Sequence, residues 1–317
     1  MTESIGAEKT MLSMAVKKKI AVISVLCMIA ATFMSGCASS YAENSQEKDD
    51  TVGIQKSNYE CVVALSKSIA DMWLLSGGTL KGVTEDAFEL DGLSDGAESV
   101  GTISKPSTEA ILSLKPDLVL LSGELAAHEQ LKAELDKLSV YTIAITVDSF
   151  EDYDNVIYMF SEMNGRDDLY QKNVTEVKKR IDSIVSEVGD KFEGTSYLCI
   201  KASATKTKAL KKDHFACNIM DDLCLYNIAD DDSALNDLSI EEIALQDPDY
   251  IFVVFMGDDD KAAQSFADEF ESQAVFKELR AVKEDKLIIL PKDLFNYKPN
   301  ARWDEAYKYV KDILEKE

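Results

Sequence analysis

Short apolar runs alternate with helix-like patterns along the chain from residue 60 to residue 147. Between these runs, apolar residues recur three or four positions apart, which is typical of amphipathic helices. β-Branched runs that alternate with helices predict a mostly parallel sheet covered by helices on both faces. The runs expected to form strands are CVVALS (61–66), LKGVT (80–84), DLVLLS (117–122) and VYTIAITV (140–147).

The same alternation returns in the last third of the chain. Strands are expected at TSYLCIKAS (195–203), DYIFVVFM (249–256) and KLIILP (286–291), and a closing helix at NARWDEAYKYVKDILEKE (300–317). Between the two regions, residues 170–188 place an apolar side chain every three or four positions, with no glycine or proline before Gly189. This pattern predicts one unbroken, stiff helix. We therefore expect an α/β protein with two lobes, 52–165 and 190–317, joined by a single long, rigid helix over 166–189.

One sequence pattern, which we call the repeated phrase, occurs once in each expected lobe. STEAILSLKPDLVLLSG begins at Ser107, and SIEEIALQDPDYIFVVFMG begins at Ser239. The serines are placed to cap a helix, the prolines end it, and a buried strand follows. The glutamates fall in the first turn, where negative charge favours the helix dipole. The matched pairs, each 132 positions apart, are Ser107 and Ser239, Glu109 and Glu241, Ile111 and Ile243, Pro116 and Pro248, and Asp117 and Asp249. Of these, only the two glutamates are not required by the fold.

The N-terminus has the pattern of an export signal. Three lysines at 17–19 precede an apolar run at 20–34 that is short for a membrane span, and small residues follow. The ending MSGC resembles a bacterial lipobox, so we expect 1–36 to be removed and Cys37 to carry a lipid; an ordinary signal followed by a coincidental cysteine is the alternative. Residues 37–51 are small, polar and charged, which predicts a flexible tether. Acidic residues near the start are unusual for a signal, so the start codon is open among Met1, Met11 and Met14.

Charge and reactive residues exclude several functions. The formal net charge of −24 argues against a nucleic-acid binder, which needs a basic face. His128 and His214 are the only histidines and fall in different lobes, so we expect no site for a bare metal ion and no intrinsic cofactor. The motifs of serine hydrolases and phosphate-binding loops are absent, so we expect no enzyme. A short disulfide between Cys217 and Cys224 is left open.

Together these features resemble a known family. The segments that carry the resemblance, within 52–317, are VVALSKSIADMWLLSGG, VGTISKPSTEAILSLKPDLVLLSG, LSIEEIALQDPDYIFV and AVKEDKLIILPKDLFNYKPNARWDEAYKYV. They are similar to the substrate-binding lipoproteins of ABC importers that take up iron–siderophore complexes, haem and cobalamin. The resemblance implies a class III periplasmic-binding-protein fold. It also implies a monomer, lipid-anchored outside the bacterial cell membrane, that captures an iron chelate between its lobes and delivers it to a permease.

In that family a glutamate on each lobe docks onto arginines of the permease, which would here be Glu109 and Glu241. Two other functions stay open: a cobalamin or corrinoid binder of the same family, and a surface sensor without a transport role. The rigid helix implies small movements of the lobes on binding.

We expect the ligand beyond the carboxyl ends of the strands, between the lobes. Residues 201–215 hold five lysines in an acidic chain, which suits an anionic chelate, although a solvated loop would look the same. Residues 295–303 combine the guanidinium of Arg302, which suits carboxylates, with aromatic rings that suit flat ligands. The alternative is that Trp303 merely anchors the last helix. His214 or Tyr297 could be an axial ligand of haem iron. The candidate ligand-binding residues are Ser66, Lys67, Lys105, Lys206, His214, Tyr297, Lys298, Arg302 and Trp303.

Overall fold

The computed structural model of the chain describes residues 59–230, 235 and 238–316. The expected signal segment, the tether and Cys37 lie outside these residues. Within the described ranges, no helix combines the length and the apolar character needed to cross a membrane.

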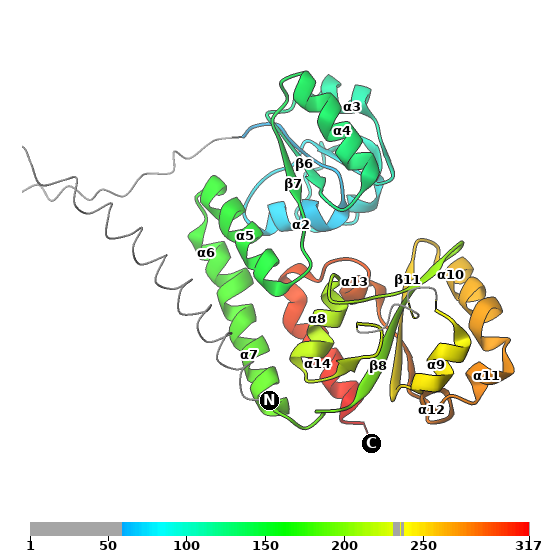
Figure 1. Cartoon of the computed structure of the whole chain (residues 1–317). Coiled ribbons are helices and arrows are strands. Elements are labelled where there is room, and N and C mark those ends of the chain that lie inside the picture. Colours follow the sequence, from blue (N-terminus) through cyan, green and yellow to red (C-terminus); the bar gives the residue numbers. More distant parts are fainter. Residues whose placement is uncertain (1–58, 231–234, 236–237, 317) are drawn as a thin grey trace, which may run out of the picture. The chain divides into compact units, whose positions relative to one another are not determined.

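The first part of the described chain is built around a five-stranded parallel sheet (Figure 1). Its strand order is β3-β2-β1-β6-β7, and we call the part of the chain around it the first lobe. The strands are β1 (Val62–Ala64), β2 (Gly82–Val83), β3 (Glu98–Ser99), β6 (Leu118–Ser122) and β7 (Thr142–Ile145). The other elements are α2 (Lys67–Leu75), a 3₁₀ turn (Glu85–Ala87), the hairpin β4 (Gly101–Thr102) and β5 (Lys105–Pro106), α3 (Thr108–Ser113), α4 (Ala126–Lys137) and α5 (Phe150–Asn164).

Alternate residues of β1 and β6 enter two different apolar clusters. Val62 and Leu118 belong to the cluster that holds residues of α2 and α5, whereas Val63 and Val119 pack with residues of α3 and α4. Side chains alternate between the faces of a strand, so both faces of this sheet are covered by helices. The near-continuous apolar runs of the sequence follow from this double burial.

A second sheet organises the later part of the chain, which we call the second lobe. Its order is β10-β8-β11-β12 with parallel pairing, and β9 joins β8 in the antiparallel sense. The strands are β8 (Ser196–Ser203), β9 (Thr207–Ala209), β10 (Tyr226–Asn227), β11 (Tyr250–Met256) and β12 (Leu287–Ile289). The helices are α8 (Phe215–Asp222), α9 (Ile240–Gln246), α10 (Asp259–Phe266), a π turn (Ala267–Glu271), α11 (Ala274–Lys277), α12 (Arg280–Lys283), α13 (Lys292–Phe295), a 3₁₀ turn (Asn300–Arg302) and α14 (Trp303–Leu314).

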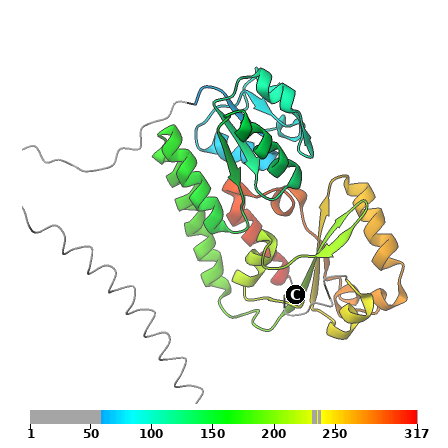
Figure 2. The ribbon, with the colours of Figure 1, turned by 45° about the horizontal axis from the view of Figure 1, so that its top comes forward.

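Between the sheets, the chain is helical without a break from residue 167 to residue 188 (Figure 2). The segment consists of α6 (Asp167–Tyr170), a π turn (Gln171–Thr175) and α7 (Glu176–Val188). This agrees with the helix predicted over 170–188, except that the π turn adds a local irregularity the 3.6-residue pattern does not reveal. The helix ends at Gly189, whose φ is 50°.

The two lobes share one apolar core. The largest cluster of buried side chains contains Trp73 and Phe160 from the first lobe and Phe215 and Trp303 from the second. The Trp303 ring lies 5.8 Å from the ring of Phe150, 6.3 Å from that of Tyr153 and 5.7 Å from that of Phe215. We call Trp303 and the three rings around it, those of Phe150, Tyr153 and Phe215, the seam. Because the seam is packed as a core, the connecting helix is not the only element that holds the lobes together.

The repeated phrase forms the same joint in both lobes. Lys115 and Asp247, which precede the prolines, have φ of 52° and 41°, so each helix ends in a left-handed residue. The Asp117 carboxylate accepts hydrogen bonds from the backbone N–H groups of Glu60 and Cys61, both 2.9 Å long. The Asp249 carboxylate accepts from the backbone N–H and the hydroxyl of Ser196, at 2.9 and 2.8 Å. Each aspartate thus fastens the start of the neighbouring central strand, which the sequence analysis did not foresee.

Candidate functional site

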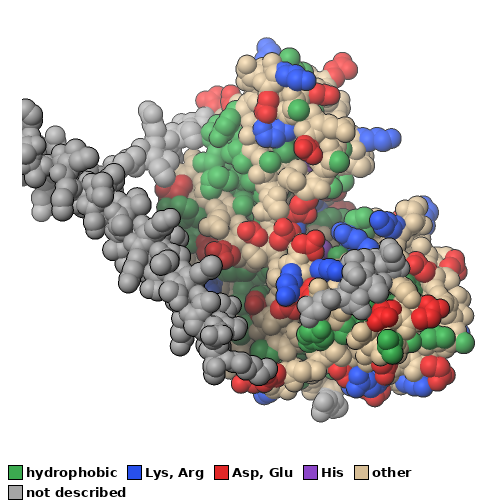
Figure 3. Space-filling model, in the orientation of Figure 1, with side chains coloured by type: hydrophobic (Ala, Val, Ile, Leu, Met, Phe, Trp, Pro, Cys, Tyr) green, Lys and Arg blue, Asp and Glu red, His purple; other side chains and the backbone are tan. Residues whose placement is uncertain are grey.

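A cavity of about 590 Å³ lies beyond the carboxyl ends of the strands and has lining residues from both lobes. The first lobe contributes residues at and beyond the ends of β1 and β6, among them Ser66, Ser122 and Glu124. The second lobe contributes Lys201 and the segment 296–298. The size is within the range of small-molecule sites. Figure 3 shows acidic and basic side chains gathered near the hollow of the surface in this view.

Much of the lining is apolar. Ile69 and Met72 of α2, Leu125 at the start of α4, and Ile145 and Val147 at the end of β7 all contribute. Such a wall offers little to a bare ion and suits a ligand with an organic surface.

Three lysines line this cavity, and two of them have partners. The Lys298 ammonium lies 3.1 Å from a Glu124 carboxylate oxygen, 3.8 Å from that of Asp148 and 5.1 Å from the centre of the Phe215 ring. The Lys67 ammonium lies 3.3 Å from Glu89 and 5.1 Å above the ring of Tyr297. Both charges are therefore balanced within the protein.

Lys201 is the exception. It is half-buried on β8, and no residue of the described ranges forms a hydrogen bond or ion pair with its ammonium group. Burial lowers the pKa of this amine, the positive charges of Lys208 and Lys298 lower it further, and the negative charge of Glu124 opposes them in part. A half-buried cation without a partner carries a free-energy cost that an anionic ligand would remove.

His128 orders one side of the cavity. Its imidazole is fully buried, and its Nδ1 accepts a 2.9 Å hydrogen bond from the backbone N–H of Ser122. Nε2 therefore carries the proton and donates to the carbonyl of Ile103 at 2.8 Å. Burial lowers the pKa of His128, which favours this neutral form. The ring thus joins two lining segments, at Ile103 and at Ser122, a role the sequence analysis missed.

Four of the nine candidate ligand residues line the cavity: Ser66, Lys67, Tyr297 and Lys298. Ser66 also caps α2, because its hydroxyl accepts from the N–H of Ile69 at 3.3 Å. Of the stretch 295–303, residues 296–298 line the cavity.

Arg302 and Trp303 do not line this cavity. The Arg302 guanidinium is already paired with Asp293 at 2.9 Å and with Glu305 at 2.8 Å. Trp303 is fully buried in the seam and cannot stack on a ligand.

The three other candidates also lie outside the cavity lining. The His214 Nδ1 accepts from the N–H of Ala216, 3.3 Å away, at the start of α8. Burial, with the nearby Lys201, Lys298 and Lys208, lowers the pKa of His214 to about 3. Lys206 lies in the exposed turn between β8 and β9, and Lys105 is exposed on β5.

The two glutamates of the repeated phrase are exposed in the first turns of α3 and α9. The Glu241 carboxylate accepts a hydrogen bond from the Ser239 hydroxyl at 2.9 Å. Its own backbone N–H and Ser239 lower the pKa of Glu241, so it is ionised at neutral pH. The Glu109 carboxylate makes no hydrogen bond or ion pair within the described part of the chain.

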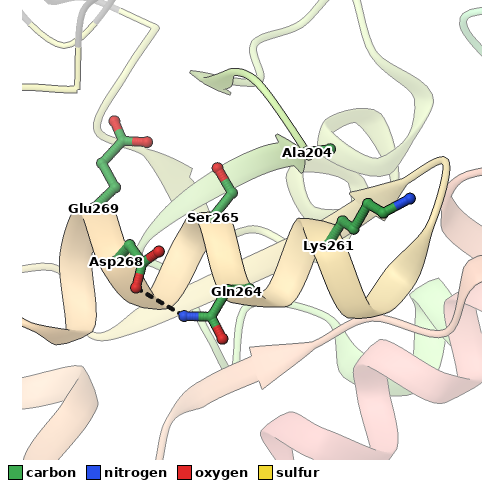
Figure 4. A pocket seen from close by; sticks show the side chains of 6 residues that line it. All are labelled: Ala204, Lys261, Gln264, Ser265, Asp268 and Glu269. Atoms are coloured by element: carbon green, nitrogen blue, oxygen red, sulfur yellow. Dashed lines mark hydrogen bonds between the residues drawn. The ribbon is translucent and has the colours of Figure 1, made fainter.

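A second hollow runs along α10 and is lined by Ala204, Lys261, Gln264, Ser265, Asp268 and Glu269 (Figure 4). Four of its five polar side chains are engaged with other protein groups. Gln264 donates to Asp268 at 2.7 Å, Lys261 pairs with Asp258 at 3.1 Å, and Glu269 accepts from the Thr207 hydroxyl. This hollow therefore offers a ligand less than the cavity between the lobes.

In the described ranges, no three His, Cys, Asp or Glu side chains are grouped closely enough to hold a metal ion. Cys217 and Cys224 are free thiols, so the disulfide left open by the sequence is not formed in the structure.

The model of the periplasmic binding protein family matches residues 62–294, and the chain belongs to this family. The Fe(3+)-citrate-binding protein YfmC of Bacillus subtilis is 27% identical over 319 residues, covering 94% of this chain and 97% of the relative. The probable siderophore-binding lipoprotein YfiY of the same organism is 24% identical, covering 84% of this chain and 89% of the relative.

The structure of IsdE from S. aureus complexed with heme matches with a TM-score of 0.70 at 16% identity. It covers 80% of this chain and 98% of that chain. At this identity the match shows the fold alone. The resemblance stated from the sequence and the predicted fold class are confirmed.

Proposed function

We propose that the chain is the extracytoplasmic substrate-binding lipoprotein of an ABC importer, which captures an anionic iron chelate between its lobes. The unpartnered ammonium of Lys201 in the cavity wall carries this proposal. An anionic oxygen of a bound chelate would supply the missing counter-charge, and charge-assisted hydrogen bonds are the strong ones. The relatives named for Fe(3+)-citrate and siderophores support the same ligand class.

The cavity also fits such a ligand in shape and polarity. Apolar side chains of the wall would face the organic part of a chelate, while Lys201 would meet its anionic group. The iron is cargo here, already held by the chelator. The cavity needs no metal ligands of its own for this task. The two relatives are named for binding Fe(3+)-citrate and a siderophore.

Delivery requires contact with a membrane permease, which we assign to Glu109 and Glu241. Both carboxylates are exposed on separate lobes that share a core, so their spacing is fixed. Such charge pairs steer association and set register. Cys37 would anchor the chain to the membrane through its lipid, and the relative YfiY is likewise named a lipoprotein.

Calorimetric titration of the full chain with ferric citrate, haemin and cobalamin tests the ligand. Calorimetry is preferable to tryptophan fluorescence, because Trp73 and Trp303 are both buried and neither lines the cavity. Ferric citrate should bind, and Lys201→Met should weaken it roughly tenfold or more, as expected for loss of a charged hydrogen bond. The matched control is Lys206→Met, a lysine of the same lobe outside the cavity, which should bind as the unmodified chain does.

Failure of ferric citrate and haemin to bind would contradict the iron-chelate proposal. Binding of cobalamin alone, unchanged by Lys201→Met, would instead support the corrinoid alternative. Binding of ferric citrate without any loss of uptake in cells that lack the gene would support a sensor.

A further inference from the structure

Helix α9 carries an exposed leucine beside Glu241. Leu245 is 77% exposed, more than any other large apolar side chain in the described ranges. Ile240 and Ile243 of the same helix are buried, whereas Glu241 and Leu245, one turn apart, share its outer side. A single exposed leucine is ordinary on a protein surface. What distinguishes this one is its neighbour, an ionised glutamate held in place by the Ser239 hydroxyl.

The repeated phrase gives an internal comparison for Leu245. The matching position in the first lobe, 132 residues earlier, is Ser113. The Ser113 hydroxyl is turned back onto its own helix, where it donates to the carbonyl of Ala110 at 2.7 Å. One turn after the glutamate, the first lobe thus presents a polar side chain and the second lobe an apolar one. The two lobes present unlike ends to any partner that contacts both glutamates.

We propose that Leu245 is a third docking contact, seated in an apolar recess of the permease beside the cationic group that meets Glu241. This rests on the proposed docking of the permease through Glu109 and Glu241. The exposed carboxylates select a cationic partner surface by charge complementarity. Two matched glutamates alone would let the lobes exchange places on a partner with two similar cationic sites. An apolar contact at one end only favours a single orientation.

The test uses cells whose uptake of radiolabelled ferric citrate depends on this chain. Leu245→Ser, which copies the first lobe, should lower initial uptake roughly tenfold when the chain is limiting, because burial of a leucine side chain is lost. Leu245→Met should retain uptake. Leu138→Ser is the matched control, because Leu138 is 55% exposed at the end of α4, and it should have no effect. Calorimetry with ferric citrate should show the same affinity for all three variants.

Normal uptake with Leu245→Ser, combined with loss of uptake in the double variant Glu109→Lys and Glu241→Lys, would overturn the role of Leu245 and leave the docking proposal standing. Normal uptake in the charge-reversed double variant as well would overturn both. Equal loss of uptake with Leu138→Ser would also contradict the proposal, because the effect would then belong to exposed leucines in general.

Discussion

The segment 296–303 contributes to both the cavity and the seam, two regions that differ in packing and in polarity. Its first half, with Tyr297 and Lys298, lines the cavity, where charges face open space and one ammonium lacks a partner. Its second half, with Trp303, belongs to the seam, where Trp303 is fully buried among aromatic rings. The change occurs at Asn300, whose φ of 52° turns the chain.

Asn300 also shows why the two regions can lie so close together. Its side-chain amide donates to the carbonyl of Ser68 at 3.0 Å and to the Asp71 carboxylate at 2.7 Å. The backbone N–H of Lys298 donates to the Ser68 hydroxyl at 3.2 Å. These bonds fix the segment on α2, so the cavity has a rigid wall on one side. Residues for recognition and residues for cohesion can thus lie five positions apart when a left-handed turn separates them.

The largest expected effect follows from removal of the central seam residue. Trp303→Ala should lower the free energy of unfolding by about 3–5 kcal/mol, the usual cost of deleting a buried large aromatic side chain. Urea denaturation followed by circular dichroism measures this change. Tyr297→Ala, in the other half of the segment, should change stability far less. Comparable losses in the two variants would mean that the cavity wall is part of the core.

A second prediction concerns the pH dependence of stability due to His214, whose ring stacks on Phe215 of the seam. The pKa of His214 falls from an ordinary value of 6.5 to about 3 on folding, mainly because of burial beside Phe215. The unfolded chain therefore binds a proton between these values and the folded chain does not. Stability due to neutral His214 is complete above pH 6.5 and is lost as pH falls toward 3.

His214→Asn removes this titration and keeps an acceptor for the N–H of Ala216, since asparagine is a good N-cap. Thermal melting of the variant should lose less stability between pH 7 and pH 4 than that of the unmodified chain. Equal losses of stability between pH 7 and pH 4 in the two proteins would show that folding does not lower the pKa of His214.

The smallest expected effect lies in the cavity. Glu124→Gln removes the carboxylate 3.1 Å from the Lys298 ammonium, so it frees a cation and takes away a charge that repels anions. Ferric citrate should bind a few-fold more tightly, while stability should change by less than about 1 kcal/mol, as for a partly exposed ion pair. Calorimetry and urea denaturation measure the two quantities. Weaker binding would indicate that Glu124 itself contacts the ligand.

The elements of the fold could be predicted from the sequence because their signals are local. β1, β6, β8 and β11 all fall within predicted apolar runs. The cap at Ser107, the left-handed residue before each proline and the end of the long helix at Gly189 also depend on a few adjacent residues. Local chemistry of this kind decides where elements begin and end.

The lining of the cavity was harder to predict from the sequence, because the direction of a side chain depends on distant packing. Trp303 and Arg302 have the chemistry of a ligand site, but the turn at Asn300 sends one into the seam and the other to Asp293. Lys201 did carry a usable signal, since it is a lone charge within the apolar run of β8. His128 carried none, because its role depends on joining Ser122 to Ile103, which lies 25 residues from His128 in the sequence.

The seam also changes how ligands of this chain can be found. Because both lobes contribute to a single apolar core, opening one should expose apolar surface of the other, and we expect the described chain to unfold as a cooperative unit. A molecule bound in the cavity above the seam would then stabilise the entire unit. At a concentration of 100 times its Kd this amounts to about 2.7 kcal/mol. A rise in melting temperature would therefore report binding of any chelate, coloured or not, without a probe placed near the site.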